Sequence, residues 1–307
     1  MRRLFRQIRE TEGVPKWMLI SGTVIVVVFV SLAIFAPLVA PYGFDQVTSG
    51  NTDFPKQAAP SSAHLFGTTV QSTDVLSRVI WGSRTAIEVV LLAVVFSIVI
   101  GVPLGLISGY VGGKLDRGLL LVMDALFAFP YLLLAIVIAF LLSDKIGQGI
   151  MSAAVAITVV YIPQYYRVVR NHVISVREEP YVEAARALGA KRRTIIGRYV
   201  FFNVIQSVPA IATLNAADAI LTLAALGFLG YGIEPTQAAE WGYDLQRAID
   251  DVGAGIWWTG LFPGLAVVLL VTGFTLVGEG LNDVLNPLIR HRRIRRPQIP
   301  ATGEERA

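Results

Sequence analysis

The sequence of 307 residues contains no cysteine, which excludes disulfide bonds, thiolate nucleophiles and Cys-ligated metal sites. Its three histidines, His64, His172 and His291, lie far apart and show no ligand spacing, which argues against a metal enzyme. Charged residues are also scarce, at 16%, whereas 54% of the residues are hydrophobic. Because an ordinary soluble domain is about one-quarter charged, this balance indicates a membrane protein.

Two catalytic motifs are missing as well. The nearest approach to a Walker A loop, at Gly112-Gly113-Lys114, has Ser108 in place of the first glycine and Leu115 in place of Ser or Thr. Phosphate binding needs that glycine-rich turn and the magnesium-binding hydroxyl, so the chain does not bind ATP in this way. A rhomboid-type Gly-x-Ser-Gly is excluded because Leu106 precedes Ser108 at the first position of the motif. We therefore expect no catalytic residue, cofactor or metal site in this chain.

Six stretches are apolar and long enough to cross a bilayer, which takes about 20 helical residues. They cover residues 17–39, 85–108, 119–142, 150–169, 204–229 and 256–280. The first exceeds the length of a signal-peptide core, so we interpret it as a retained anchor helix. Prolines within the other five stretches predict kinks or breaks at Pro103, Pro130, Pro163, Pro209 and Pro263.

The distribution of basic residues predicts the orientation. With the N-terminus inside, 21 of the 26 Lys and Arg residues fall on the inner side. Both termini are therefore expected in the cytoplasm, and the acidic loop 230–255 outside. The arginines between 290 and 296 follow the last stretch directly, so we interpret them as a topology anchor near anionic lipid, with no nucleic-acid role. The N-terminal arginines are expected on the inner membrane surface.

The longest cytoplasmic loop lies between the fourth and fifth stretches and predicts two short helices. Pro180 can open a helix, residues 181–188 favour one by composition, and Gly189 suits its C-terminal stop. Residues 191–199 then form a second amphipathic piece that leads into the fifth stretch. Such a long loop exceeds a simple connection in a compact bundle.

Within this loop, Glu183-Ala184-Ala185 followed after three residues by Gly189 resembles the EAA loop of ABC import permeases. In that family the loop forms coupling helices that seat in a cleft on the ATPase subunit. The resemblance implies that Glu183 anchors the loop by charge, that Ala184 and Ala185 permit close approach, and that Gly189 makes the turn; Leu188 belongs to the same docking set. The family pattern ends in Leu-Pro, but residues 201–203 are Phe-Phe-Asn here, which leaves open whether a helix break precedes the fifth stretch.

Other segments resemble the C-type permeases of oligopeptide and dipeptide importers, in the right order along nearly the whole chain. They are residues 64–68, 74–78 and 82–84 before the second stretch, 228–232 and 240–242 in the outer loop, and 262–266 and 278–283 in and after the last stretch. The resemblance implies an all-α membrane protein with six transmembrane helices and the type I ABC importer transmembrane domain fold. It also implies three parts: an N-terminal segment, first helix and extracytoplasmic loop (1–80), a five-helix permease core (81–290) with the coupling loop at about 178–203, and a basic cytoplasmic tail (291–307).

The function implied is that of a non-catalytic permease subunit in a bacterial cytoplasmic (inner) membrane. It would pair with a second, similar permease, and two ATPase subunits would bind ATP and magnesium below. An extracytoplasmic substrate-binding protein would deliver short peptides and touch the loops at 42–80 and 230–255. Asp218, near the middle of the fifth stretch, is a candidate pathway residue, because a charge in hydrocarbon is costly; it could attract a peptide amino terminus or form a structural pair.

Three alternatives remain. A same-family importer could carry nickel, glutathione or haem, since the binding protein usually sets the cargo. A gradient-driven secondary transporter would be expected to show repeated halves with matched broken helices, and the sequence shows no such repeat. A six-span enzyme lacks a convergent nucleophile and base.

Overall fold

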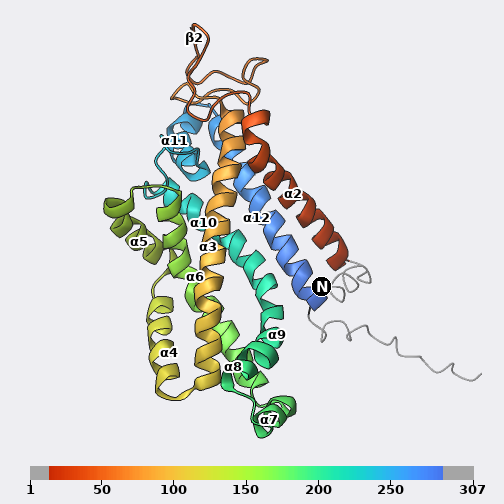
Figure 1. Cartoon of the computed structure of the whole chain (residues 1–307). Coiled ribbons are helices and arrows are strands. Elements are labelled where there is room, and N and C mark those ends of the chain that lie inside the picture. Colours follow the sequence, from red (N-terminus) through yellow and green to blue (C-terminus); the bar gives the residue numbers. More distant parts are fainter. Residues whose placement is uncertain (1–13, 286–307) are drawn as a thin grey trace, which may run out of the picture.

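The computed structural model describes residues 14–285, which form an elongated bundle of helices (Figure 1). The predicted N-terminal surface segment and the arginine-rich tail lie outside the described residues. The main helices are α2 (Val14–Val39), α3 (Val75–Val111), α4 (Gly113–Ala128), α5 (Tyr131–Ile146), α6 (Ile150–Val176), α7 (Pro180–Ala187), α10 (Val208–Phe228), α11 (Trp241–Gly253) and α12 (Trp258–Leu285). The described residues contain one small sheet, the antiparallel pair β1 (Thr48–Ser49) and β2 (Thr52–Asp53).

Four of the predicted spans correspond to single membrane-length apolar segments: α2, α3, α12 and the continuous segment Arg192–Phe228 that ends in α10. The third predicted span, 119–142, is not one helix. Its residues divide between α4 and α5, which meet at a bend of 97° around Phe129 and Pro130. The fourth, α6, has 27 residues but is not among the segments apolar enough to qualify by composition. An all-α membrane fold is confirmed, with one of its six predicted spans broken.

Of the five prolines predicted to disturb spans, one lies at a sharp break. Pro130 sits in the bend between α4 and α5. Pro209 occupies the first turn of α10, directly after a short 3-10 turn, and the helical segment Arg192–Phe228 continues through it. Pro103, Pro163 and Pro263 lie inside α3, α6 and α12, which each continue through them. Proline alone therefore did not identify the break.

The centre of the bundle is the contact between α3 and α6. Gly101, Gly105 and Gly109 follow one another at intervals of four and present one face of α3 without side chains. A Cβ added at Gly105 would lie only 2.7 Å from the backbone oxygen of Tyr166. Small residues spaced in this way let two membrane helices approach closely. The sequence carried this signal, and sequence reasoning missed it.

The approach to the fifth predicted span is irregular but unbroken. A short α8 (Arg192–Thr194) passes into a π-helical stretch (Ile195–Val200), α9 (Phe201–Val204) and a 3-10 turn (Ile205–Ser207) before α10. The helix break that the family pattern left open is therefore replaced by changes in helical pitch. Such π and 3-10 segments inside a helix are frequent at functional sites.

Candidate functional site

The predicted coupling loop forms a separate short helix, α7, at the end of the bundle opposite the β1–β2 hairpin (Figure 1). Pro180 occupies the first turn of α7, as the sequence predicted. Gly189 follows the helix with φ at +80°, a conformation that glycine adopts without strain. There the Gly189 N–H donates to Arg186 O and the Ala190 N–H to Ala185 O, both at 3.0 Å. These bonds satisfy carbonyls at the helix end and fix the turn.

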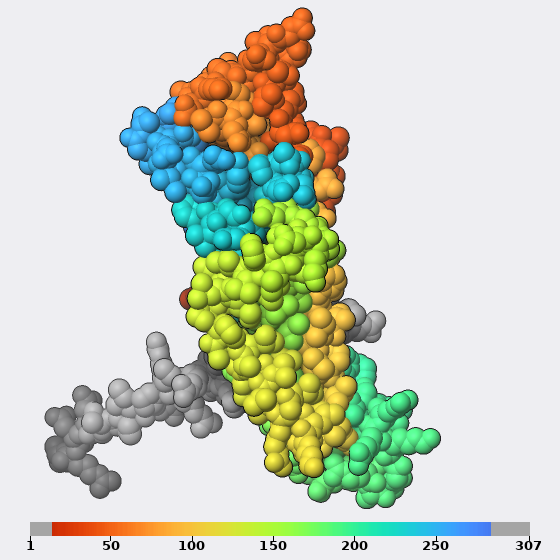
Figure 2. Space-filling view, turned by 90° about the vertical axis from the view of Figure 1, so that its left-hand side faces the viewer, coloured from red at the N-terminus to blue at the C-terminus, as the bar shows by residue number. Residues whose placement is uncertain are grey.

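The two faces of α7 have different surroundings. Val182 and Ala185 are buried against the rest of the chain, whereas Glu183 and Ala184 are exposed. Leu188, just after the helix, is 88% exposed, the largest fraction among the exposed large apolar residues described. The structure therefore places Ala184 where a partner could approach, and Ala185 where it packs internally. Figure 2 shows this part of the chain, in green, protruding at one end of the molecule.

A polar cluster joins the end of α6 that leads to α7 with α3 and α4. Asp116 of α4 accepts hydrogen bonds from Arg170 Nε at 2.5 Å and Nη2 at 2.6 Å. It also accepts one from Ser108 Oγ of α3 at 2.5 Å. Arg177, just after α6, donates from Nη1 to a backbone carbonyl in the last turn of α3 at 3.0 Å. The end of α6 that leads into the predicted coupling loop is thus bonded to α3 and α4, an arrangement that the separate sequence positions did not reveal.

A cavity of about 550 Å³ opens at the bend between α4 and α5. Its described lining is largely aromatic and apolar, with Phe127, Phe129, Tyr131 and Tyr161 among its residues. Asp218 of α10, which is exposed, is the one charged side chain in that lining. Its carboxylate forms no ion pair with a described residue. The structure thus places Asp218 in the lining of a cavity, and both readings of its role, pathway residue or structural pair, stay predictions.

The cavity wall is linked to the polar cluster through α4 and α6. Arg167 Nη2 of α6 lies 2.7 Å from Asp124 Oδ1 of α4, and its guanidinium stacks 4.0 Å from the centre of the Phe127 ring. Phe127 itself lines the cavity. A movement of α6 relative to α4 would therefore change the Arg167–Asp124 and Arg170–Asp116 ion pairs and the cavity wall together.

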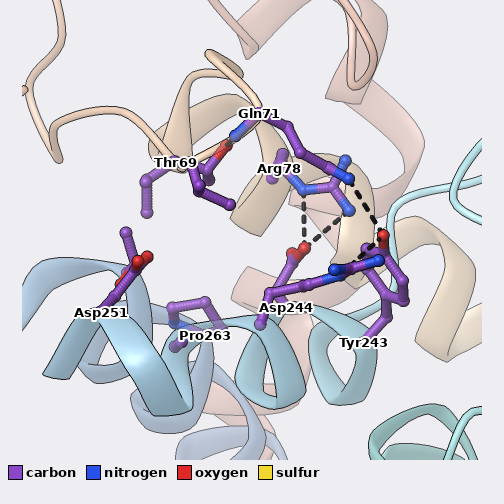
Figure 3. A pocket seen from close by; sticks show the side chains of 12 residues that line it. Thr69, Gln71, Arg78, Tyr243, Asp244, Asp251 and Pro263 are labelled. Atoms are coloured by element: carbon purple, nitrogen blue, oxygen red, sulfur yellow. Dashed lines mark hydrogen bonds and ion pairs between the residues drawn. The ribbon is translucent and has the colours of Figure 1, made fainter. Parts of the chain in front are cut away.

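At the opposite end, the loop before α3 is bonded to α11, and we call residues 42–74 with α11 the outer cap. Arg78 Nε and Nη2 reach Asp244 Oδ1 at 2.8 and 2.7 Å, and Gln71 Nε2 donates to the Tyr243 hydroxyl at 3.1 Å (Figure 3). Gln57 Nε2 adds a bond to Asp251 Oδ1 at 2.5 Å. The two loops predicted to meet a binding protein thus form one connected surface.

Burial changes the ionisation of two carboxyl groups in this region. Burial raises the pKa of Glu240 to about 8, although the backbone N–H groups of Gly242 and Tyr243 donate to it at 2.8 Å and act in the opposite sense. Burial also raises the pKa of Asp244, opposed by its ion pair with Arg78. Glu240 caps the first turn of α11, so its side chain positions the helix whether charged or neutral.

Comparison with known proteins shows which family the chain matches. Residues 101–291 match the family described as binding-protein-dependent transport system inner membrane component. The dipeptide transport system permease protein DppC of Alkalihalophilus pseudofirmus is 36% identical, covering 94% of this chain and 90% of the relative. The glutathione transport system permease protein GsiD of Pectobacterium atrosepticum is 31% identical (88% and 87%). The probable D,D-dipeptide transport system permease protein DdpC of Escherichia coli is 34% identical (88% and 90%).

A solved structure shows the same fold. The chain resembles one from inward-facing conformations of the MetNI methionine ABC transporter with a TM-score of 0.55 and 21% identity. The match covers 67% of this chain and 96% of the other. The predicted type I transmembrane domain fold is thereby confirmed.

Proposed function

Because this chain belongs to the family of binding-protein-dependent transport system inner membrane components, we propose that it forms half of the translocation pathway of an ATP-driven importer of short peptides. The permease role agrees with the apolar helices of membrane length. Three of the relatives support the peptide cargo, since they are named for dipeptides, D,D-dipeptides and peptides. The observation that carries the proposal is the 36% identity to a dipeptide permease over 94% of the chain.

Glutathione is the second candidate cargo. Relatives at 31 to 33% identity are named for it, and glutathione is itself a small peptide. Nickel has less support, because the described residues contain no group of three His, Asp or Glu side chains placed to hold a metal ion. The chain's own cavity offers one carboxylate and several aromatic rings, a lining suited to an organic molecule with an amino group.

We place the ATPase contact on the coupling loop. Glu183 and Ala184 of α7 and Leu188, just after it, are exposed, and an apolar and an acidic side chain on one loop suit a cleft with an apolar floor and a basic rim. Two ATPase subunits would bind ATP and magnesium, one of them at this loop, while a second permease completes the pathway. ATP-driven closure would move α7 and, through Arg170 and Arg177, the helices that carry the cavity wall.

The outer cap is the proposed contact for a substrate-binding protein. It lies at the end of the bundle opposite α7, so the distribution of basic residues that puts the coupling loop in the cytoplasm puts the outer cap outside (Figure 1). Its bonds between segments up to 194 positions apart hold it as one surface. Both termini would then lie in the cytoplasm of a bacterial cell.

The first test is a pull-down of the tagged chain, expressed with its partners, in mild detergent. Wild type is expected to bring down the ATPase and a second permease. The double variant Glu183→Arg, Gly189→Pro should lose the ATPase and keep the permease, because it reverses the exposed charge and forbids the positive φ of the turn. The control Lys114→Glu reverses an exposed charge on α4 outside the loop and should retain both. Wild type recovered alone under every condition would sink the proposal and favour a gradient-driven transporter.

A second test addresses the pathway. Asp218→Asn should depress uptake and leave recovery of the ATPase intact, because it removes the single charge among the described lining residues of the cavity while preserving side-chain size. Asp144→Asn, which neutralises an exposed carboxylate near the end of α5, is the matched control and should transport normally. Unchanged uptake in the Asp218 variant would remove this residue from the pathway.

A further inference from the structure

A second hollow, of about 390 Å³, lies between the end of α3 and the coupling loop. It is separate from the cavity at the α4–α5 bend, with which it shares no lining residue. Its described lining comes from the last turn of α3, from α7 and from the segment after it: Tyr110, Val111, Arg186, Ala190, Arg192 and Ile195. Tyr110 and Val111 lie just after the expected span 85–108, so we expect the hollow near the cytoplasmic surface of the bilayer.

The charge of this hollow is purely positive. Arg186 and Arg192 both line it, its described lining contains no carboxylate, and neither arginine forms an ion pair with a described residue. The neighbouring arginines differ in this respect, since Arg170 is paired with Asp116 and Arg177 with Glu178. Two arginines lining one recess without a described counter-charge favour an anionic occupant, and guanidinium suits the oxygens of a phosphate group.

An apolar stripe leads directly into the hollow. Ile100, Ile107 and Val111 lie on one side of α3 and are 42%, 43% and 48% exposed. Their spacing of seven and four residues keeps them on one helical face. Val111, the last of them, is itself part of the lining, beside Tyr110. Tyrosine is enriched where a membrane helix meets the polar surface.

We propose that this hollow binds the phosphate of an anionic phospholipid in the inner leaflet, whose acyl chain lies along the stripe on α3. The shape matches such a lipid in both parts: a basic recess at the cytoplasmic end of a membrane helix and an apolar face above it. The inference rests on the proposed orientation, with α7 in the cytoplasm. The lipid would touch both α3 and the coupling loop, so the anionic lipid content of the membrane would affect the position of the helix that docks the ATPase.

The test uses the complete transporter, with its ATPase and second permease, in vesicles of phosphatidylethanolamine to which phosphatidylglycerol is added in steps. Phosphatidylglycerol retained after detergent extraction is measured by native mass spectrometry, and ATP-driven uptake is measured in the same vesicles. Arg186→Gln with Arg192→Gln is expected to weaken retention about fivefold for each arginine, or about 25-fold together. Uptake by wild type should rise with phosphatidylglycerol, and uptake by this double variant should not.

Matched controls come from the same loop. Arg193 and Arg198 are exposed arginines that do not line the hollow, and Arg193→Gln with Arg198→Gln should retain phosphatidylglycerol as wild type does. Equal loss in both double variants would show general attraction of a basic loop to the membrane and overturn the site. Displacement of the lipid by millimolar inorganic phosphate would also overturn it, because the hollow would then be a site for free phosphate.

The ATPase is the competing occupant, and the pull-down separates it. If Arg186→Gln with Arg192→Gln abolishes recovery of the ATPase in phosphatidylethanolamine alone, the arginines bind an acidic group of the ATPase, and the lipid proposal is wrong. Retention of phosphatidylglycerol is measured without transport, so a wild type that retains the lipid but fails to import peptide would contradict the proposed function and leave the lipid site standing.

Discussion

Replacing Gly105 with alanine tests whether the close contact between α3 and α6 holds the bundle together. The new Cβ would lie 2.7 Å from the backbone oxygen of Tyr166 and 3.0 Å from Val169 Cβ and Cγ1. A backbone oxygen in a helix moves only with the helix, so α3 and α6 must separate. A Cβ added at Gly101 or Gly109 would likewise lie 2.8 Å from an atom of α6, so α3 cannot make room at Gly105 by pivoting on either neighbour.

The magnitude follows from comparison with a glycine that touches nothing. Gly118 lies in α4, where an added Cβ would meet no atom within 4 Å. Gly→Ala inside a helix stabilises it by about 1 kcal/mol, and this gain is common to both substitutions. Overpacking a close contact costs about 1 to 3 kcal/mol. The free energy of unfolding of Gly105→Ala should therefore be lower than that of Gly118→Ala by about 1 to 3 kcal/mol.

The assay is reversible unfolding of the isolated chain by sodium dodecyl sulfate in mixed micelles, followed by circular dichroism. Gly105→Val should lower the midpoint further than Gly105→Ala, because valine adds two more methyl groups against the same carbonyl. At the exposed Gly118, the valine variant should differ from the alanine variant only by the lower helix propensity of valine relative to alanine. Equal unfolding free energies for Gly105→Ala and Gly118→Ala would refute the reasoning, since the contact would then have room for a side chain.

Three further predictions follow. Leu188→Asp should leave the stability of the isolated chain unchanged, because Leu188 is 88% exposed, and should reduce recovery of the ATPase; wild-type recovery would contradict its docking role. The pKa of Glu240 is raised from 4.5 to about 8 in the folded state, so between these pH values the folded state holds a proton that the unfolded state has lost. The melting temperature should therefore fall as pH rises through this interval. Glu240→Gln should flatten the curve of melting temperature against pH, and a wild-type curve already as flat would show that folding does not raise this pKa. Asp116→Asn should cost about 1.5 to 3 kcal/mol, and Arg170→Gln should add little to it; fully additive losses in the double-mutant cycle would mean that the two groups act separately.

The coupling loop was predictable because its signals are local. Pro180 at the start, Gly189 at the end and the helix-favouring residues between them act within ten positions of each other, and α7 forms where they predicted it. Which face of that helix is buried was not predictable, since Ala184 and Ala185 are both alanine, yet Ala184 is exposed and Ala185 is buried. Which face is buried depends on the segments that α7 packs against.

The sequence by itself determined the class of the molecule. Runs of apolar residues long enough for a bilayer, the distribution of Lys and Arg, and the Glu183-Ala184-Ala185 motif each depend on neighbouring residues, and they predicted a multi-span permease. Only the tertiary structure decided the 97° bend at Pro130, since Pro103, Pro163 and Pro263 have the same local chemistry and lie in continuous helices.

The tertiary structure likewise decided every polar contact that connects the two ends of the bundle to its helices. Arg78 meets Asp244 across 166 positions, and Arg170 meets Asp116 across 54. A charge in a sequence does not show which distant charge it will face, because that depends on how the helices pack. The apolar and small residues of α3 and α6 set that packing, and the ion pairs then form where the packed helices place them.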